Sequence, residues 1–420
     1  MKKVFLKTFT FLSLASFLSP KSFAAEWEQI MTNPNTYAHF ITSAGVQLVS
    51  DYSDYQDGGI FRSQDGGMIW EDCGVEDYWY SKFYETGEYV FAIGSSCRIA
   101  RSNDKGITWE MLDYSEPLKS YYSPELLEMT CCYAITELNG SLYIGDFISG
   151  IVLRSENYGD TWEETDRESL IINVNGEKIL DPVYNLVGYD GKIYSFGLYS
   201  VHTLDPAEGV WHELPISSNC MAISVIMDDL LVCGRSMPDE SPSTPFLLYT
   251  DGTSWNTIDR PQTPDNNVRA LHSDGNWLFA ANSGGPVWYT DNFGDQWQLA
   301  DGLPELLFPL TLSTDDKYLY TALYSPLPDD LLSGVWRISK EDLGIAGVEL
   351  PAKENSRLSF TGDSLWSKEV LDEVTIYDLS GKTVGRYKNI TSVSLSSFPK
   401  GEYIYVVKDG NKRFAGKFVL

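Results

Sequence analysis

The strongest constraint on the fold of this 420-residue chain is a segment that recurs with the pattern S/T-x-D/N-x-G-x-x-W. Complete copies stand at residues 63–70, 102–109, 155–162 and 290–297. Two copies are degenerate, since 250–255 is shortened and 203–211 is one residue longer. A segment that returns at intervals of several tens of residues indicates that one structural unit is repeated along the chain.

The chemistry of the repeated segment is that of a tight turn. A hydroxyl and a short carboxylate or amide can accept hydrogen bonds from backbone N–H groups, and glycine supplies the positive φ that the turn requires. The tryptophan fills space between neighbouring sheets, which contributes about 2–3 kcal/mol by burial. These residues are therefore assigned to the framework: Ser63, Asp65, Gly67, Trp70, Ser102, Asp104, Gly106, Trp109, Ser155, Asn157, Gly159, Trp162, Thr290, Asn292, Gly294 and Trp297.

The spacing of the repeats sets the architecture. The tryptophans follow one another at intervals of 39, 53, 49, 44 and 42 residues, the range of a four-stranded propeller blade. Pairs of apolar strands precede the turns, with inner strands expected at 37–42, 78–84, 133–137, 183–188, 221–226, 268–272 and 307–312. The second strands are expected at 46–50, 89–93, 142–145, 192–196, 230–233, 277–281 and 318–323. Seven pairs predict an all-β fold, a seven-bladed β-propeller.

The seventh repeat supplies a third strand at 334–339, but no tryptophan follows it at the expected distance. The segment 26–30 has the sequence of an outer strand and predicts that the N-terminus closes the ring. On these motifs the chain resembles the Asp-box (BNR-repeat, sialidase-like) propellers. That resemblance implies architecture and leaves activity open, because sialidases, other glycosidases, receptors and assembly factors share the fold.

The two ends of the sequence carry export signals. Residues 1–24 have Lys2 and Lys3, an apolar stretch and a small-residue cleavage site, the pattern of a secretory signal peptide. Residues 25–345 carry 16 basic and 50 acidic side chains, a body that would repel nucleic acid. After residue 346 the repeats stop and the charge balance reverses.

The tail predicts a small β-sandwich over 346–420, with strands at 370–379, 392–398, 401–407 and 415–420. The runs 374–384, 395–403 and 417–420 resemble the C-terminal sorting domain of type IX secretion cargo. The Pro-Asn-Pro usual near the start of such domains is absent. The resemblance implies delivery through the periplasm to the cell surface or the medium, with the type IX machinery as a partner.

A sialidase-like site needs three arginines around a substrate carboxylate. Arg62, Arg101, Arg154 and Arg337 recur at one repeat position, which makes them framework and leaves Arg98, Arg167, Arg235, Arg260 and Arg269. Because the Phe-Arg-Ile-Pro signature of sialidases is missing, we do not favour that activity. The sequence predicts neither a cofactor nor a metal site, and the Asp51, Asp54 and Asp57 spacing lacks the ligand order of a calcium loop.

The loops that join second to third strands, and outer strands to the next inner strand, share one face of the disk. Long loops at 51–57, 112–130 and 235–245 make this face the candidate site, with Tyr52, Asp54, Tyr55, Tyr121 and Tyr122 as candidate ligand-binding residues. These rings could equally serve only to pack the loops. The preferred hypothesis is a non-catalytic module that binds a glycan or a protein. The rival is a glycoside hydrolase that uses two carboxylates on this face.

Six cysteines in an exported chain indicate disulfides. Cys220 and Cys233 fall in one hairpin and are predicted to pair. Cys73, Cys97, Cys131 and Cys132 are expected to gather near the second and third blades. Their pairing stays open among Cys73–Cys97, a bridge from either to the vicinal cysteines, and a Cys131–Cys132 ring.

Overall fold

The computed structural model divides the chain into two compact units, residues 1–343 and 344–420. It describes residues 26–33, 35–51, 59–75, 78–216, 222–227, 230–235, 247–258, 268–275, 277–282, 285–304, 307–325, 331–345, 358–360, 364–378, 383–396, 398–409 and 412–420. The following paragraphs concern those residues, and each unit is described by itself.

In the first unit the described strands form seven four-stranded antiparallel sheets, each ordered from an inner to an outer strand. The first four are β2 (Thr36–Ile41), β3 (Gln47–Asp51), β4 (Gly59–Ser63), β5 (Glu71–Asp72); β6 (Tyr80–Thr86), β7 (Tyr89–Gly94), β8 (Arg98–Ser102), β9 (Glu110–Asp113); β10 (Cys132–Leu138), β11 (Ser141–Asp146), β12 (Val152–Ser155), β13 (Glu163–Glu164); and β16 (Val183–Tyr189), β17 (Lys192–Gly197), β18 (Val201–Leu204), β19 (Trp211–Glu213). The last three are β20 (Ala222–Met227), β21 (Leu230–Arg235), β22 (Leu247–Thr250), β23 (Trp255–Ile258); β24 (Val268–Asp274), β25 (Trp277–Asn282), β26 (Val287–Thr290), β27 (Gln298–Ala300); and β28 (Phe308–Thr314), β29 (Tyr318–Tyr324), β30 (Gly334–Ser339), β1 (Glu28–Thr32).

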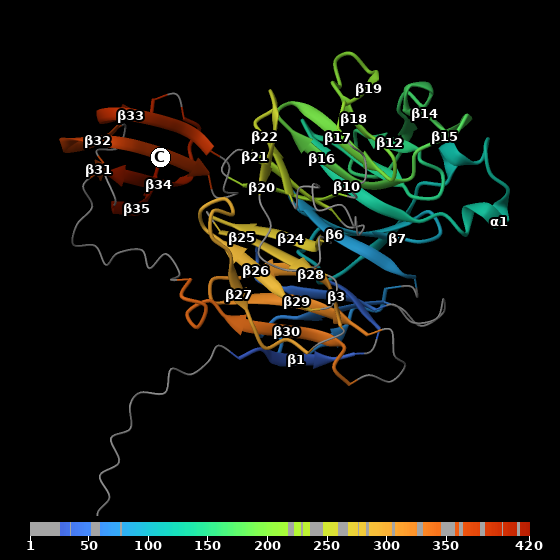
Figure 1. Cartoon of the computed structure of the whole chain (residues 1–420), viewed down its shortest axis with the longest axis horizontal. Helices are drawn as coiled ribbons and strands as arrows, with labels where there is room; N and C mark the ends of the chain where they lie inside the picture. Colours follow the sequence, from blue (N-terminus) through green and yellow to red (C-terminus); the bar gives the residue numbers. More distant parts are fainter. Residues whose placement is uncertain are drawn as a thin grey trace, which may run out of the picture. The chain divides into compact units, whose positions relative to one another are not determined.

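The sheets close into a ring. The inner strands β2, β6, β10, β16, β20, β24 and β28 contact one another in that order, and β28 contacts β2. The seventh sheet takes its outer strand from the other end of the unit, because β1 pairs antiparallel with β30 (Figure 1). Trp27 is buried beside this junction and donates a hydrogen bond from Nε1 to the Ala300 carbonyl at 3.2 Å. The predicted propeller and its closure by the N-terminal strand are confirmed.

The repeated segment forms the turn between the third and outer strands. In the second sheet the Ser102 hydroxyl accepts from the Gly106 N–H at 2.8 Å, and one Asp104 oxygen accepts from the N–H groups of Ile107 and Thr108. Gly106 has φ +92°, and its carbonyl accepts from the Trp109 indole at 3.2 Å. The turn of the first sheet repeats these bonds, as do the Ser/Thr, Asx and Gly bonds of the third and sixth sheets. The polar side chains of the repeat thus make their hydrogen bonds within the turn.

The tryptophans of the repeat pack between neighbouring sheets. Trp70 lies against residues of the first and seventh sheets, Trp109 against the first and second, and Trp162 against the second and third. The repeated arginines cross from the third strand to the outer strand, in the pairs Arg62–Glu71, Arg101–Glu110, Arg154–Glu163 and Arg337–Glu28. Each pair ties a short outer strand to its sheet.

Two loops on the face opposite the repeat turns carry structure of their own. The loop after β9 contains a 3-10 turn, η1 (Glu116–Leu118), and one short helix, α1 (Pro124–Leu127). The loop after β13 contains η2 (Glu168–Leu170) and a hairpin of β14 (Ile171–Val174) and β15 (Glu177–Leu180). Sequence reasoning missed this hairpin, although Asn175-Gly176 between two apolar runs is its usual signal, and both residues have positive φ.

The C-terminal unit is a five-stranded antiparallel arrangement of β31 (Ser359–Phe360), β32 (Ser364–Asp378), β33 (Thr383–Ser394), β34 (Glu402–Asp409) and β35 (Lys412–Val419). The register of β32 breaks between Trp366 and Leu371, and residues from both halves, such as Leu365 and Val374, share one core. This is the predicted small β-sandwich. The strand expected at 392–398 is wrong, because β33 ends at Ser394 and the next residues turn.

The cysteines of the second and third sheets differ from the sequence expectation. Cys73, Cys97, Cys131 and Cys132 are separate thiols, so none of the pairings considered for them is formed. Cys97 and Cys132 share one buried cluster, whereas Cys73 packs in another, between the first and second sheets. Cys233 is likewise not part of a disulfide, so the predicted Cys220–Cys233 bridge is wrong for this structure; Cys220 itself lies outside the described residues.

Candidate functional site

A β-bulge recurs near the start of the inner strands. The register with the second strand skips one residue in six of the seven sheets, between the same two positions each time. The skipped residues are Tyr37, Ser81, Tyr133, Tyr184, Arg269 and Leu310. A bulge leaves its extra residue outside the ladder and re-aims the side chain. We call these six residues the bulge ring.

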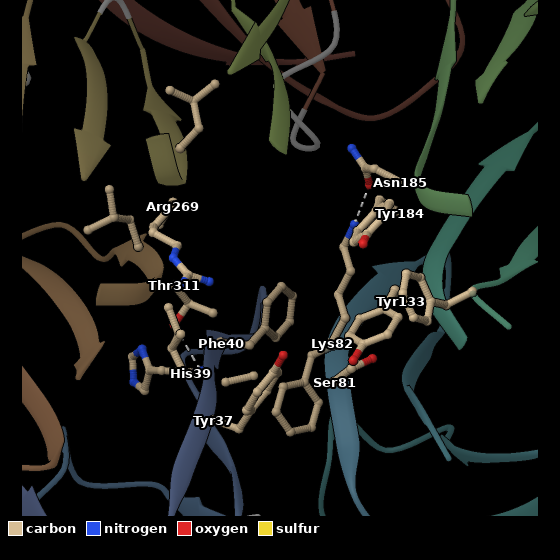
Figure 2. A pocket seen from close by; sticks show the side chains of 17 residues that line it. Tyr37, His39, Phe40, Ser81, Lys82, Tyr133, Tyr184, Asn185, Arg269 and Thr311 are labelled. Atoms are coloured by element: carbon tan, nitrogen blue, oxygen red, sulfur yellow. Dashed lines mark hydrogen bonds between the residues drawn. The ribbon is translucent and has the colours of Figure 1, made fainter. Parts of the chain in front are cut away.

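All six members of the bulge ring line a cavity of about 570 Å³ (Figure 2). The other lining residues come from the same inner strands, with Phe147 added from the β11–β12 loop. Because these strands surround the axis of the propeller, the cavity is axial. Its volume is in the range of pockets that hold small molecules or short chain segments.

Four aromatic residues of one cavity wall, Tyr37, Tyr133, Phe147 and Tyr184, belong to a continuous run of rings that also includes Trp79. Tyr37 and Trp79 have ring centroids 5.0 Å apart, Trp79 and Tyr133 5.4 Å, Tyr133 and Phe147 5.2 Å, and Phe147 and Tyr184 4.8 Å. All four contacts are edge-to-face, the arrangement that the quadrupoles of the rings favour. Such a wall is preorganised for an apolar or ring-bearing ligand.

Two cationic side chains stand in this cavity. Lys82 Nζ donates a hydrogen bond to Asn185 Oδ1 at 2.9 Å, and burial lowers the pKa of this lysine to about 8. The Arg269 guanidinium lies over the ring of Phe308, 5.4 Å from its centroid. Figure 2 shows Lys82 and Arg269 reaching in from opposite sides. None of the described residues that line the cavity is an aspartate or a glutamate.

Of the predicted tyrosines, the two that the structure describes do not line this cavity. Tyr121 donates to Glu164 at 2.9 Å and lies under the Arg167 guanidinium, 3.9 Å from ring centroid to Cζ. Tyr122 packs against the buried cluster of the second and third sheets. Tyr52, Asp54 and Tyr55 lie outside the described residues. Both described tyrosines therefore make structural contacts.

Of the five arginines that the repeat left unexplained, Arg269 is the one whose described side chain lines the cavity. Arg98 pairs with Asp113 at 2.9 Å, and Arg167 covers Tyr121. The side chain of Arg235, like Arg260, lies outside the described positions. The described arginines do not form the triad that a sialidase-like site needs.

Three buried carboxylates on the loop-rich face have raised pKa values, in each case because burial disfavours the charged form. Asp181 accepts from the N–H groups of Tyr199 and Ser200. Asp146 accepts from the Ser149 N–H at 2.7 Å, and Asp51 from Asn33 at 3.1 Å. Asp146 and Asp181 thus hold loop backbone. None of the three carboxylates lines the cavity.

The sequence predicted the loop-rich face as the functional face but did not predict the axial cavity. The missed signal lies in the repeat itself, because Tyr37, Tyr133 and Tyr184 each stand at the start of an expected inner strand. In the described part of the chain no cluster of three or more His, Cys, Asp or Glu side chains could hold a metal ion. No described helix has the length and apolarity needed to cross a membrane.

Comparisons with solved structures identify the fold of the first unit. YCF48 bound to D1 peptide shares 14% identity with a TM-score of 0.52, over 75% of this chain and 94% of that one. The WD40 repeats of RRP9 share 10% identity with a TM-score of 0.50, over 75% and 97%. The extracellular domain of the putative one component system BT4673 from B. thetaiotaomicron shares 12% identity with a TM-score of 0.55, over 94% and 59%. At these identities the likeness shows the propeller fold alone.

The C-terminal unit carries the more specific likeness. No curated protein matches the chain. Residues 350–420, however, match the family of the secretion system C-terminal sorting domain. Proteins with this domain are cargo of type IX secretion, so the protein is delivered through the periplasm to the cell surface or the medium.

Proposed function

We propose that the propeller is an exported, non-catalytic recognition module that holds a segment of a protein ligand in its axial cavity. The observation that carries this proposal is the bulge ring. Six strands use the same backbone irregularity to turn different side chains toward one space. A framework repeated for stability has no need to vary the residue at that position.

The loop face on which the inner strands begin favours a peptide over a sugar. Three exposed apolar side chains stand on neighbouring loops: Met129 is 66% exposed, Ile148 52% and Tyr199 43%. The Phe147 N–H donates to the Cys131 carbonyl at 2.7 Å and joins two of these loops beside the cavity. Exposed apolar side chains on neighbouring loops of one face are typical of protein docking surfaces.

The hydrolase alternative receives less support from the cavity. Glycoside hydrolysis by the usual mechanisms requires two carboxyl groups on either side of the scissile bond. The cavity offers amine, guanidinium, amide, hydroxyl and aromatic groups at its described walls. A hydrolytic site would have to lie elsewhere on the protein.

The same proposal assigns a role to each segment of the chain. Residues 1–24 serve as the signal peptide, the Asp-box propeller of 25–345 carries the recognition site, and 346–420 addresses the protein to the type IX machinery. YCF48, a propeller of the same fold, is described as bound to a D1 peptide, which supports a peptide ligand by analogy of fold only.

A binding screen tests this function. The purified propeller with its tail is offered a displayed library of random peptides and, in parallel, a panel of polysaccharides with reducing-end release measured. We expect selected peptides that bind, and loss of binding in Tyr184→Ala and Ile148→Glu. The matched control is Tyr249→Ala, a partly buried tyrosine that contacts Phe293 at 5.6 Å outside the cavity. Polysaccharide binding without peptide binding would replace the proposal with a glycan module, and turnover would replace it with the hydrolase.

A further inference from the structure

The cations of the propeller are, as a rule, paired with its abundant carboxylates. Residues 25–345 hold three acidic side chains for each basic one. Accordingly, Lys105 pairs with Glu85 at 2.8 Å, and Lys340, which is 6% exposed, pairs with Asp274. In such a chain a partly buried amine without a carboxylate is an exception.

Lys82 is that exception. Among the described residues it donates to the neutral Oδ1 atom of Asn185, and it forms no ion pair with them. An ammonium group has three donors, so at least part of its hydrogen-bonding capacity is available. Keeping a partly buried charge without a counter-charge costs free energy, and perturbed lysines of this kind concentrate at functional sites.

The position of Lys82 follows from the repeat. Lys82 and Asn185 are the residues after the bulge in the second and fourth sheets. The third sheet has Ala134 at the equivalent position, and this small side chain leaves room for Lys82 to reach Asn185. The amine is therefore held at the cavity wall by the packing of three sheets (Figure 2).

The other side of the cavity adds a second positive group. Arg269 is a member of the bulge ring, is exposed, and approaches from the sixth sheet. Its planar guanidinium is suited to bidentate contact with a carboxylate. Two cations from separated sheets thus face one cavity in a body whose net charge is strongly negative.

Building on the proposed function, we infer that the protein ligand anchors itself in the cavity through a carboxylate, which takes the counter-ion position beside Lys82, while Arg269 adds positive potential from the opposite side. The carboxylate comes from the free C-terminus of a peptide or from an acidic side chain near its end. The aromatic wall receives the adjoining apolar residue. The ligand supplies the negative charge that the cavity lacks.

The experiment uses sets of related peptides with the full exported chain. Each peptide selected by the library is made as the free acid, as the C-terminal amide, and with its acidic side chains changed to amides. N-acetylphenylalanine and its amide serve as small probes in a thermal-shift and ligand-observed NMR assay. Proteins are wild type, Lys82→Met, Arg269→Gln and the control Lys105→Met, whose paired amine lies outside the cavity.

We expect neutralising the carboxylate to weaken peptide binding at least tenfold. A loss in the C-terminal amide assigns the carboxylate to the free C-terminus, and a loss in the peptide with changed side chains assigns it to an acidic residue. Lys82→Met should abolish the preference for the acid while Lys105→Met keeps it. The ligand-free Lys82→Met protein should melt at or above the wild-type temperature, because an uncompensated charge has been removed; a marked loss of stability would contradict the inference.

The two proposals fail differently. If the acid and amide forms of each peptide bind at the cavity with the same affinity, the carboxylate inference is overturned and the recognition function stands. If no peptide binds, the proposed function is wrong. Binding of N-acetylphenylalanine that is unchanged by Lys82→Met, or its absence in the wild type, overturns the carboxylate site directly.

Discussion

Trp27 offers the sharpest test of how the ring closes. It immediately precedes β1, is 8% exposed, and donates to the Ala300 carbonyl of the sixth sheet at 3.2 Å. The residue thus connects the strand that completes the seventh sheet to the neighbouring sheet. Removing its ring leaves a cavity at the one place where two distant parts of the chain are joined only by noncovalent contacts.

The expected cost follows from the burial of the ring. Truncating a buried tryptophan to alanine costs about 3–5 kcal/mol, which includes about 1 kcal/mol for the lost hydrogen bond. For a domain of this size each kcal/mol lowers Tm by about 2 °C. We therefore expect Trp27→Ala to melt about 6–10 °C below the wild type. Trp27→Phe keeps most of the burial, loses the indole donor and should melt about 2–4 °C lower.

Differential scanning calorimetry of the exported chain measures this shift. Leu299→Ala is the control, because Leu299 lies on β27, next to Ala300, with 41% of its surface exposed. It should melt within about 1 °C of the wild type. A Trp27→Ala protein with an unchanged Tm would show that the ring does not depend on its terminal strand, and the closure argument would be refuted.

Further expectations concern the turn, the core histidine and the thiols. Gly106→Ala, with φ +92° and its added Cβ 2.9 Å from a core side chain, should lose more stability by urea titration than Gly45→Ala, which has φ +78° and open space; equal losses would contradict the packing argument. Burial lowers the pKa of His39 to about 4, so this residue should lower the free energy of unfolding by up to about 3 kcal/mol as the pH drops from 6.5 to 4. The pH dependence of His39→Gln should be smaller by that amount, and an unchanged pH dependence would contradict the argument. Burial raises the pKa of Cys131 to about 12 and that of Cys73 to about 11, so both thiols should resist alkylation at pH 7 until the protein is denatured; a disulfide at either in peptide maps would disprove their free state.

The strand plan could be predicted because it is encoded locally. Each repeat brings its own turn, hairpin signal and apolar strands, so the inner strands β2 and β24 lie within one or two residues of their predicted bounds. The closing strand was predictable for the same reason, since 26–30 has the sequence of an outer strand. The C-terminal unit lacks a repeated turn motif, and β33 accordingly extends over residues that were predicted to lie between strands.

The site was beyond prediction because it depends on register. Whether Tyr133 points into the axis or into a sheet is decided by one unpaired residue, and a bulge has no fixed signature in sequence. Tyr121, which looked available for a ligand, instead meets Glu164 at the end of β13 and Arg167 in the loop that follows it. The isolation of Lys82 from carboxylates is visible only once the sheets are in place.

The contrast between the two kinds of repeated position explains where function can reside in this fold. At the turns, serine, aspartate and glycine are repeated because their hydrogen bonds are satisfied within the turn, and any change would leave backbone groups unpaired. At the bulges the backbone is repeated while the side chain varies from tyrosine to serine, arginine and leucine. The bulge supplies a fixed direction without dictating a residue, so selection can alter the ligand there without disturbing the ring. Residues that recur identically therefore hold the propeller together, and the ones that differ at equivalent bulges are the place to look for its specificity.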